Sequence, residues 1–289
     1  MDRLYLVVPC YNEEEVLPET VRRLTDKLRR MEEKGLVSGD SRILLVDDGS
    51  RDRTWELICG FHRENPTVSG LKLSRNRGHQ NALVAGLLTA RELCDITISL
   101  DADLQDDIEV LDQFVEEYHK GAQIVYGVRS ARDTDTAFKR STAMGFYGLM
   151  KKMGVDIVSN HADYRLMSKK ALDCFSGYHE VNLFLRGIVP LIGFPTAVVT
   201  YERSERFAGE SKYPLKKMLS FAWDGITSFS TKPLSLITGV GVGIGFLSGL
   251  GFLAALICLC CKVAVAGWVW VLISVWLALG IQLVALGLV

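Results

Sequence analysis

The sequence ITISLDADLQD, residues 96–106, decides the fold class of this chain. Its first five residues are a short β-rich run, and carboxylates follow at once at Asp101, Asp103 and Asp106. In sheets of mostly parallel strands, ligands bind beyond the carboxyl ends of the strands. A buried strand that leads directly into acidic residues therefore predicts such a sheet, with a polar site at its edge.

Four more β-rich runs support this interpretation, at residues 4–9, 42–46, 68–73 and 123–128, and helical patterns fill the gaps between them. This alternation predicts an α/β fold with a mostly parallel sheet and helices on both faces. The residues at the ends of the runs are then the first candidates for a site. They include PCYNE at 9–13 and DDGS at 47–50, so acidic groups are expected to collect along one edge.

Composition and motifs argue against several classes of protein. A dinucleotide-binding sheet has a Gly-rich turn after its first strand, and neither GxGxxG nor a P-loop occurs in these 289 residues. This argues against an NAD-dependent enzyme and against an ATPase. The 33 Lys and Arg residues balance 34 Asp and Glu residues, which argues against a nucleic-acid partner.

The DxD pattern of Asp101 and Asp103 is a candidate metal site. A turn that starts at the strand end can bring both carboxylates to one hard cation, Mg²⁺ or Mn²⁺, with the phosphates of a substrate completing the shell. An isolated DxD is more often a solvated turn or a helix cap, and we expect Asp106 or Asp107 to cap the next helix. The acidic pair 47–48 at another strand end favours the functional interpretation.

The last part of the chain has a different composition. After Lys232, Lys262 is the only charged residue, and the apolar stretches 234–261 and 263–289 each exceed the about 20 residues that a membrane-spanning helix needs. We expect two spanning helices joined by a tight turn near Lys262 and Gly267. A buried hairpin in a soluble core would rarely be apolar all round for this length. Glycines recur in the first stretch and would suit self-association into a homo-oligomer.

The first residues contain no long apolar signal segment, so we expect the first domain to stay cytoplasmic. Lys212, Lys216, Lys217 and Lys232 precede the first apolar stretch, in agreement with the positive-inside tendency. Apolar residues in 211–232 fall at helical spacing, which predicts an amphipathic helix at the membrane surface, with packing onto the soluble domain as the rival interpretation. The predicted domains are therefore 1–210, catalytic and cytoplasmic, 211–232, juxtamembrane, and 233–289, transmembrane.

Three motifs together carry a family resemblance. PCYNEE at 9–14, VDDGSRDRT at 46–54 and DADLQD at 101–106 resemble the inverting nucleotide-sugar glycosyltransferases of family 2, which have the GT-A fold. DYRLM at 163–167 and RFAGESKY at 206–213, followed by two apolar stretches, resemble the polyprenyl-phosphate glycosyltransferases within that family. This group includes bactoprenol glucosyltransferases and dolichyl-phosphate mannose synthases. The resemblance covers nearly the whole chain.

The resemblance implies a role for individual residues. The nucleotide sugar would be bound by residues at the first strand ends: Pro9, Tyr11, Asn12, Glu13, Asp48, Arg75, Asp101 and Ala102. The Mg²⁺ or Mn²⁺ ion would be held by Asp101, Asp103 and Gln105. Phosphates of donor or acceptor would be contacted by four basic residues: Arg129, Arg140, Arg206 and Lys212.

The catalytic residues implied by the resemblance are Asp103 and Asp163. Inverting transferases usually need a carboxylate base. A lipid phosphate acceptor, however, is already largely ionised near neutral pH, because its second pKa is about 6. Asp163 is therefore expected either to act as the base or to orient the acceptor. An ion pair with Arg165 is the structural alternative.

The expected reaction is inverting transfer of a sugar from a nucleotide diphosphate sugar, with UDP-glucose as the leading candidate, to polyprenyl (undecaprenyl) phosphate. The expected location is the cytoplasmic leaflet of a bacterial plasma membrane. Two alternatives stay open from the sequence. One is a membrane glycosyltransferase that acts on a diacyl lipid or a polysaccharide, although the QxxRW motif of processive synthases is absent. The other is a catalytically inactive scaffold that binds a nucleotide sugar.

Overall fold

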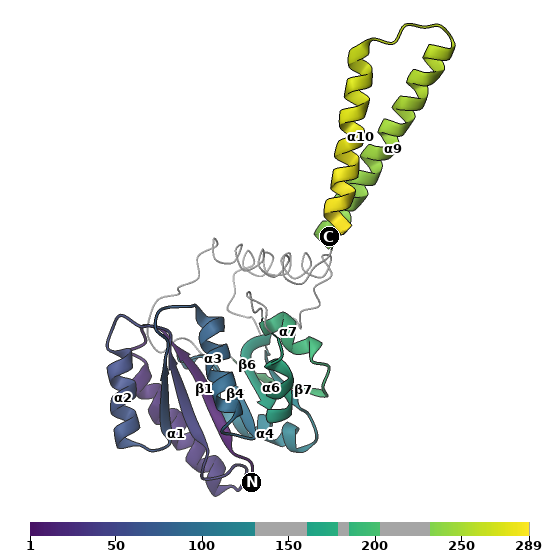
Figure 1. Cartoon of the computed structure of the whole chain (residues 1–289). Helices are drawn as coiled ribbons and strands as arrows, with labels where there is room; N and C mark the ends of the chain where they lie inside the picture. Colours follow the sequence, from purple (N-terminus) through teal and green to yellow (C-terminus); the bar gives the residue numbers. More distant parts are fainter. Residues whose placement is uncertain (131–160, 179–184, 203–231, 289) are drawn as a thin grey trace. The chain divides into compact units, whose positions relative to one another are not determined.

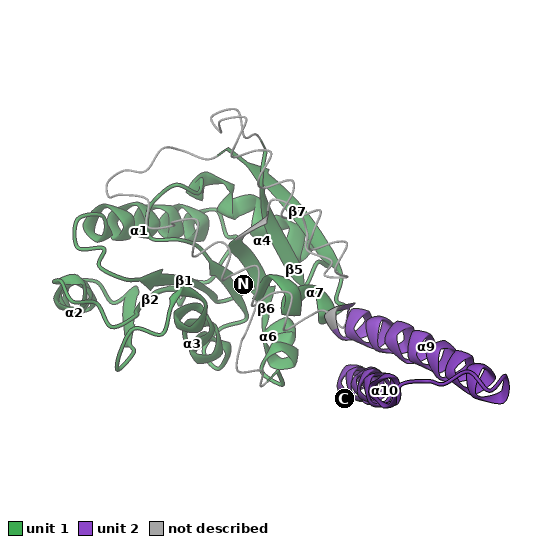
Figure 2. Ribbon diagram, turned by 90° about the horizontal axis from the view of Figure 1, so that it is seen from above, with its two compact units in different colours: residues 1–147, 157–220 green, residues 148–156, 221–289 purple. Residues whose placement is uncertain are grey.

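The computed structural model describes residues 1–130, 161–178, 185–202 and 232–288. The chain divides into two compact units, residues 1–147 with 157–220 and residues 148–156 with 221–289 (Figure 2). The predicted boundary at 210 lies outside the described residues, and the three-part division of the chain stays a prediction.

The first unit alternates strands and helices along the chain (Figure 1). Its elements are β1 Leu4–Cys10, α1 Leu17–Glu33, β2 Arg42–Asp47, α2 Thr54–Glu64, β3 Val68–Lys72, α3 His79–Arg91, β4 Ile96–Ser99, the 3₁₀ helix η1 Ile108–Val110, α4 Leu111–His119, β5 Ile124–Arg129, β6 His161–Ser168, α6 Lys169–Phe175, α7 Leu185–Leu191 and β7 Thr196–Tyr201. The five strands predicted from the sequence are all present, with ends that differ by one residue.

One seven-stranded sheet holds this unit together, in the order β3-β2-β1-β4-β6-β5-β7. The pairs β2–β3, β1–β2, β1–β4 and β5–β7 are parallel, and only β6 runs antiparallel to its neighbours β4 and β5. The predicted α/β fold with a mostly parallel sheet is confirmed.

Two strands, β6 and β7, were missing from the prediction. β6 carries Asp163 and Arg165 in its interior, so its sequence lacks the apolar run of a buried strand. β7 is an edge strand with several exposed residues. Because β6 is antiparallel, its beginning lies at the edge where the parallel strands end. The register pairs Ser99 with Arg165, so Asp163 lies beside the end of β4.

Helices cover both faces of the sheet, with α1 and α4 on one face and α3 and α6 on the other (Figure 2). Leu6 and Val8 of β1 join the core cluster that contains Leu24 of α1. Val7, which points the other way, lies under α3 at Gly86. A Cβ at Gly86 would be 2.5 Å from Val7 Cγ1, so the glycine lets α3 pack directly on the sheet. This packing brings the first residues of α3 to the carboxyl edge.

The second unit contains two long helices, α9 Lys232–Cys260 and α10 Gly267–Leu288. Their segments Leu234–Cys260 and Gly267–Leu288 have a mean hydropathy of 2.3 and are only 11% and 6% buried, unlike the core helix of a soluble protein. Both are long and apolar enough to cross a membrane. They pack closely, because a Cβ at Gly280 would be 2.8 Å from the backbone nitrogen of Gly245.

Candidate active site

The residues predicted to form a site come together at the carboxyl edge of the sheet. The registers pair Cys10 with Asp47 and Arg129 with Tyr201, so β1, β2, β5 and β7 end at this edge. The end of β4 and the beginning of β6 lie there as well.

The loops that follow β1 and β2 are tied to each other. Asn12 Oδ1 accepts a hydrogen bond from the Arg51 backbone N–H at 2.9 Å, and the Asn12 N–H donates to Ser50 Oγ at 3.0 Å. The Glu13 N–H donates to Thr54 Oγ1 at 2.9 Å. Asn12 has a φ of 54°, a left-handed conformation that asparagine tolerates better than most residues. These contacts fix the partly buried residues Tyr11, Asn12 and Glu13 at the edge.

Asp48 anchors the loop that leads into α3. Its carboxylate accepts hydrogen bonds from the backbone N–H groups of Arg77 at 2.7 Å and Gly78 at 2.9 Å, and the residue is 2% exposed. Gly49 has a φ of 66°, and a Cβ there would be 2.6 Å from the carbonyl carbon of Arg75. Asp48 therefore positions the segment that contains Arg75. Its predicted contact with the nucleoside stays a prediction.

The acidic loop after β4 is anchored by α1. Thr20 Oγ1 donates to the Ala102 carbonyl at 2.7 Å, and Lys27 Nζ donates to the Glu109 carbonyl at 2.9 Å. Asp107 Oδ1 accepts from the Glu109 N–H at 2.9 Å and caps η1, so Asp107 is the cap that the sequence placed at Asp106 or Asp107. Both ends of the loop are thus fixed to the same helix.

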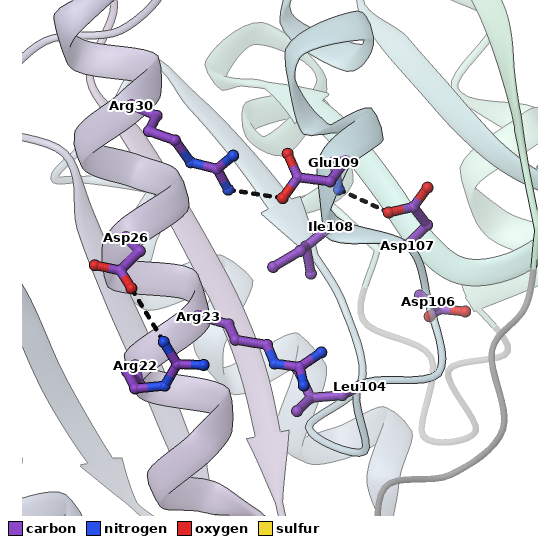
Figure 3. Close-up of a pocket in the computed structure, with 9 residues that line it drawn as sticks. All are labelled: Arg22, Arg23, Asp26, Arg30, Leu104, Asp106, Asp107, Ile108 and Glu109. Atoms are coloured by element: carbon purple, nitrogen blue, oxygen red, sulfur yellow. Dashed lines mark hydrogen bonds and ion pairs between the residues drawn. The ribbon is translucent and has the colours of Figure 1, made fainter.

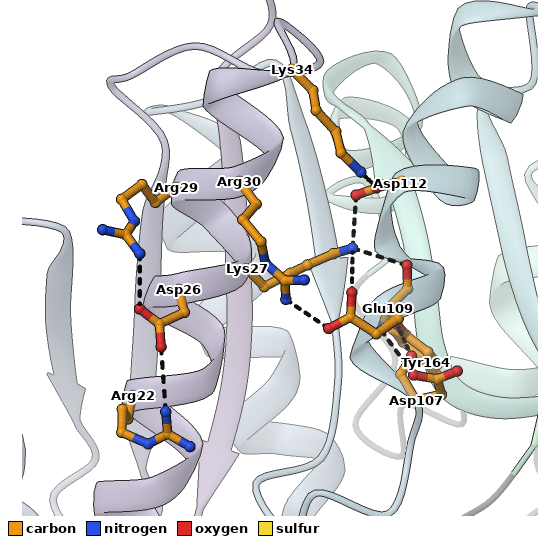
Figure 4. Close-up of polar contacts among 10 residues, drawn as sticks. All are labelled: Arg22, Asp26, Lys27, Arg29, Arg30, Lys34, Asp107, Glu109, Asp112 and Tyr164. Atoms are coloured by element: carbon orange, nitrogen blue, oxygen red, sulfur yellow. Dashed lines mark hydrogen bonds and ion pairs between the residues drawn. The ribbon is translucent and has the colours of Figure 1, made fainter.

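Lys27 is the centre of a charged cluster between α1 and the loop (Figure 4). It is 2% exposed, and Nζ lies 2.9 Å from Asp112 Oδ1 and 3.2 Å from Glu109 Oε2. Arg30 and Lys34 bind the same two carboxylates from the surface. Burial raises the pKa of Asp112, but hydrogen bonds from Lys34 and Lys27 outweigh it and hold the pKa below its usual value.

A cavity of about 270 Å³ lies between α1 and the acidic loop (Figure 3). Its lining combines basic and acidic side chains of both elements: Arg22, Arg23, Asp26, Arg30, Leu104, Asp106, Asp107, Ile108 and Glu109. None of the residues predicted to bind nucleotide sugar or metal lines it. Arg22 pairs with Asp26 and Arg30 with Glu109, so these two cations of the lining are already paired, and we assign no ligand to the cavity.

Two residues that the sequence did not single out contact the predicted catalytic residue. His79 Nε2 lies 3.5 Å from Asp163 Oδ2 and 3.6 Å from Asp101 Oδ1. Arg186 Nε lies 3.4 Å from Asp163 Oδ1. The expected ion pair of Asp163 with Arg165 is not among the ion pairs of the described residues, because Arg165 lies over the ring of Tyr126. His79 could have been recognised as a candidate site residue from the sequence, because it lies a few residues beyond a strand end and next to a glycine.

The charges around Asp163 determine its protonation. Burial raises the pKa of Asp163, but the charge of Arg186 and a hydrogen bond from His79 hold it well below its usual range. Burial lowers the pKa of His79, and its hydrogen bond to Asp163 and the charge of Asp101 together raise it to about 9. Asp163 is therefore an ionised carboxylate between two cations, and it is a weak base.

Arg129 belongs to a second network, with Tyr201 and Asp106. The Tyr201 hydroxyl donates to Asp106 Oδ1 at 2.6 Å and accepts from Arg129 Nε at 3.4 Å. Burial and the charge of Asp101 raise the pKa of Asp106 to about 6. The network connects the acidic loop to the end of β5.

The acidic loop suits a divalent cation. Burial raises the pKa of Asp101, and the neighbouring carboxylates of Asp163 and Asp103 raise it further. Asp106 Oδ2 is buried and has no hydrogen-bond partner among the residues that the structure describes. A cation would offset this crowding of carboxylates. The described residues contain no group of three acidic, His or Cys side chains that could hold a metal alone. A Mg²⁺-type site needs no such cage, since one or two carboxylates and substrate phosphates suffice.

Three of the predicted phosphate-binding residues, Arg140, Arg206 and Lys212, lie outside the described residues, as does nearly all of the segment 211–232. Of that predicted set, the structure therefore places Arg129 alone.

A mostly parallel sheet with an acidic loop at its carboxyl edge is the arrangement expected of a glycosyltransferase of the GT-A type. The model of the family described as glycosyl transferase family 2 matches residues 5–175, so this chain belongs to that family. The fold is also similar to that of GalNAc-T7, solved with UDP, GalNAc and Mn²⁺, with a TM-score of 0.52 at 16% identity over 81% of this chain and 52% of that chain.

Relatives cover most of the chain. An uncharacterized glycosyltransferase of Bacillus subtilis, YkoT, is 53% identical over 99% of this chain and 85% of its own length. A bactoprenol glucosyl transferase of Shigella phage SfV is 39% identical over 85% of this chain and 78% of its own length. The predicted resemblance to family 2, with bactoprenol glucosyl transferases among the relatives, is confirmed.

Proposed function

We propose that this chain transfers a sugar from a nucleotide diphosphate sugar, with UDP-glucose as the leading candidate, to polyprenyl phosphate of the undecaprenyl type. The observation that carries the proposal is the contact of Asp163 with His79 and Arg186 at one sheet edge. The same chain also has two helices of membrane-spanning length. The similarity to a bactoprenol glucosyl transferase supports the acceptor class.

The order of the strands supports one orientation of the nucleotide sugar along the carboxyl edge of the sheet. The loops of β1 and β2 hold the residues predicted for the nucleoside, and the next strand, β4, carries the acidic loop. Neighbouring strands lie about 4.8 Å apart, so a nucleotide sugar laid across the edge extends over several strands. The nucleoside would lie over β1 and β2, the diphosphate at β4 and the sugar near β6. The acceptor phosphate would approach from the side of β5, where Arg129 ends the strand.

Asp101, Asp103 and Gln105 would hold a divalent cation, Mg²⁺ or Mn²⁺. The cation supplies charge neutralisation for the departing nucleoside diphosphate. The ionised acceptor phosphate attacks the anomeric carbon from the face opposite the leaving group, which inverts the configuration. Arg129, held by Tyr201, would bind a phosphate oxygen through its guanidinium. Asp163 would orient the reactants, because its two cationic partners leave it little basicity.

The second unit supports a lipid-linked acceptor. A polyprenyl chain stays in the bilayer while its phosphate is at the surface, so a catalytic unit attached to α9 and α10 meets it there. We propose that the catalytic unit is on the cytoplasmic side, where nucleotide sugars are made, and that residues 211–232 form an amphipathic helix at that surface. The lysines at and before the first residue of α9, among them Lys212 and Lys232, favour this orientation.

The test is transfer of radiolabelled sugar to extractable lipid by the purified full chain with undecaprenyl phosphate. UDP-glucose, UDP-N-acetylglucosamine and GDP-mannose are compared in parallel, with Mg²⁺ or Mn²⁺. We expect transfer from one donor that is lost in Asp103→Asn and retained in the control Asp173→Asn, whose carboxylate is exposed and lies outside the site.

Transfer only to a diacyl lipid or a polysaccharide would replace the proposed acceptor. Donor binding without transfer to any acceptor would favour the inactive scaffold.

A further inference from the structure

Asp163 lies where helices α3 and α7 begin. Gln80 Oε1 accepts a hydrogen bond from the Leu185 backbone N–H at 3.3 Å, which joins the first turns of the two helices. The residue before Gln80 and the residue after Leu185 are His79 and Arg186, and both contact the carboxylate of Asp163. The imidazole of His79 and the guanidinium of Arg186 thus meet at one carboxylate.

These three side chains differ in exposure. Asp163 is 10% exposed, whereas His79 is 33% and Arg186 is 28% exposed. The carboxylate is therefore fixed in the wall of the site, and the two cationic groups extend past it to where a ligand can reach them. A carboxylate has about four lone-pair positions, and His79 and Arg186 together make three contacts with it, so one position is left for a hydroxyl donor.

Their place in the sheet identifies the part of the donor that they would meet. β6 lies between β4, which carries the acidic loop, and β5, which ends at Arg129. His79 contacts Asp101 as well as Asp163, so it connects the loop to β6. With the diphosphate at the loop and the acceptor phosphate near β5, the group between them is the sugar.

We propose that His79, Asp163 and Arg186 form the surface that recognises the hydroxyl groups of the donor sugar, and that His79 and Arg186 also position Asp163. Asp163 accepts a hydrogen bond from a sugar hydroxyl, and Arg186 and His79 donate to sugar oxygens. This inference rests on the proposed function, because it takes a nucleotide sugar as the ligand. A site that pairs buried polar groups with hydroxyls discriminates strongly between sugars, since a mismatched sugar leaves those groups unpaired.

The experiment compares the affinity for UDP with that for UDP-glucose, and the affinity for GDP with that for GDP-mannose. It uses calorimetry on the full chain in detergent with Mn²⁺ and without acceptor. The variants are His79→Gln, Asp163→Asn and Arg186→Gln. We expect affinity for the preferred nucleotide sugar to fall by about 10- to 100-fold in each variant. Affinity for the nucleoside diphosphate should change by less than about twofold, since the lost contacts are to the sugar.

Two matched controls separate this effect from general damage. His119→Gln and Arg91→Gln remove the same side-chain types from ion pairs outside the site, with Asp2 and Glu92 respectively. Each control should leave the affinities for the nucleoside diphosphate and for the nucleotide sugar unchanged. A positioning role for His79 predicts that His79→Lys, which keeps a cation, regains part of the affinity for the nucleotide sugar.

Three results would separate the possibilities. Equal loss of affinity for the nucleoside diphosphate and for its sugar derivative would overturn the inference, because it would place the three residues at the diphosphate or the metal. Unchanged affinities in all variants would also overturn it. If the wild-type chain binds no nucleotide sugar at all, the proposed function fails and the inference fails with it.

Discussion

Asp163 and Arg186 face each other across the junction of β6 and α7, with Asp163 Oδ1 3.4 Å from Arg186 Nε. The carboxylate that the sequence predicts either as the catalytic base or as the group that orients the acceptor is therefore neutralised by a guanidinium. This pairing favours an orienting role for Asp163 over proton removal.

The pH dependence of Asp163→Asn distinguishes these roles. Against the effect of burial, Arg186 and His79 hold the pKa of Asp163 well below its usual range, so Asp163 stays ionised between about pH 5 and 8. We expect kcat/KM for the donor to fall by about 10- to 100-fold at all these pH values. The acid limb of the profile should follow the acceptor phosphate, with a pKa of about 6, in both proteins. An acid limb that disappears only in the variant would identify Asp163 as the base.

Tyr201→Phe tests the network around Arg129. Removal of the hydroxyl leaves Asp106 without its 2.6 Å hydrogen bond while the ring can keep its packing on Tyr164. We expect the free energy of unfolding to fall by about 1–3 kcal/mol and the KM for the acceptor to rise. Denaturant titration and initial rates measure the two effects. Tyr118→Phe is the control, because the Tyr118 hydroxyl has no hydrogen bond within the described residues, and an equal loss there would contradict the prediction.

Lys27 and Lys34 bind the same carboxylate from positions of different exposure. Lys27 is 2% exposed and Lys34 is 59% exposed, and both pair with Asp112. We expect Lys27→Met to lower the free energy of unfolding by about 2–3 kcal/mol, because Asp112 and the Glu109 carbonyl lose a buried donor. Lys34→Met should cost less than about 1 kcal/mol, since a surface pair is screened by water. Similar costs in urea titrations would show that burial does not set the strength of these contacts.

Asp112 also contributes to acid denaturation. Its pKa is lower in the folded chain than its usual value, so its stabilising effect is complete above the unfolded pKa, about 3.9. The effect is lost as pH falls through the lower, folded pKa. We expect Asp112→Asn to be less stable than wild type at neutral pH, and the difference to shrink toward about pH 2 to 3. Urea midpoints at both pH values measure this, and a difference independent of pH would refute it.

The packing of α9 on α10 depends on individual glycines. A Cβ at Gly280 would be 2.8 Å from the Gly245 backbone nitrogen, whereas a Cβ at Gly239 would meet nothing within 4 Å. Gly280→Leu should therefore separate the helices and lower the thermal midpoint in detergent, and Gly239→Leu should not. The same pair of variants would reveal self-association: a change of oligomeric state in Gly239→Leu alone would assign the outer face to contacts between copies.

The fold could be predicted because most of it depends on local patterns. The runs at 4–9, 42–46 and 96–100 are mostly apolar and almost entirely buried, and each strand end is marked by polar residues. β6 could not be found in this way. Its buried polar residues Asp163 and Arg165 contact groups from β5, α3 and α7, which are distant in sequence.

The site was predicted where a short motif carries the chemistry, as at Asp101 and Asp103. His79 and Arg186 were missed because their contacts with Asp163 depend on where two helices begin in space. Asp48 shows the converse. Its acidic motif was recognised, but its carboxylate binds the backbone of Arg77 and Gly78, a partnership that no local pattern reveals.

The antiparallel direction of β6 has an evolutionary consequence. The chain leaves the sheet after β5 and returns to it at His161, which pairs with Val128, so the exit and the return lie side by side at one edge. Whatever connects them can be lengthened, shortened or exchanged without moving a strand. The parallel pairs β1–β2 and β2–β3 are instead joined through α1 and α2, which return the chain to the opposite edge. The edge that holds the candidate site is therefore also the place where the chain can change in length while the sheet stays the same.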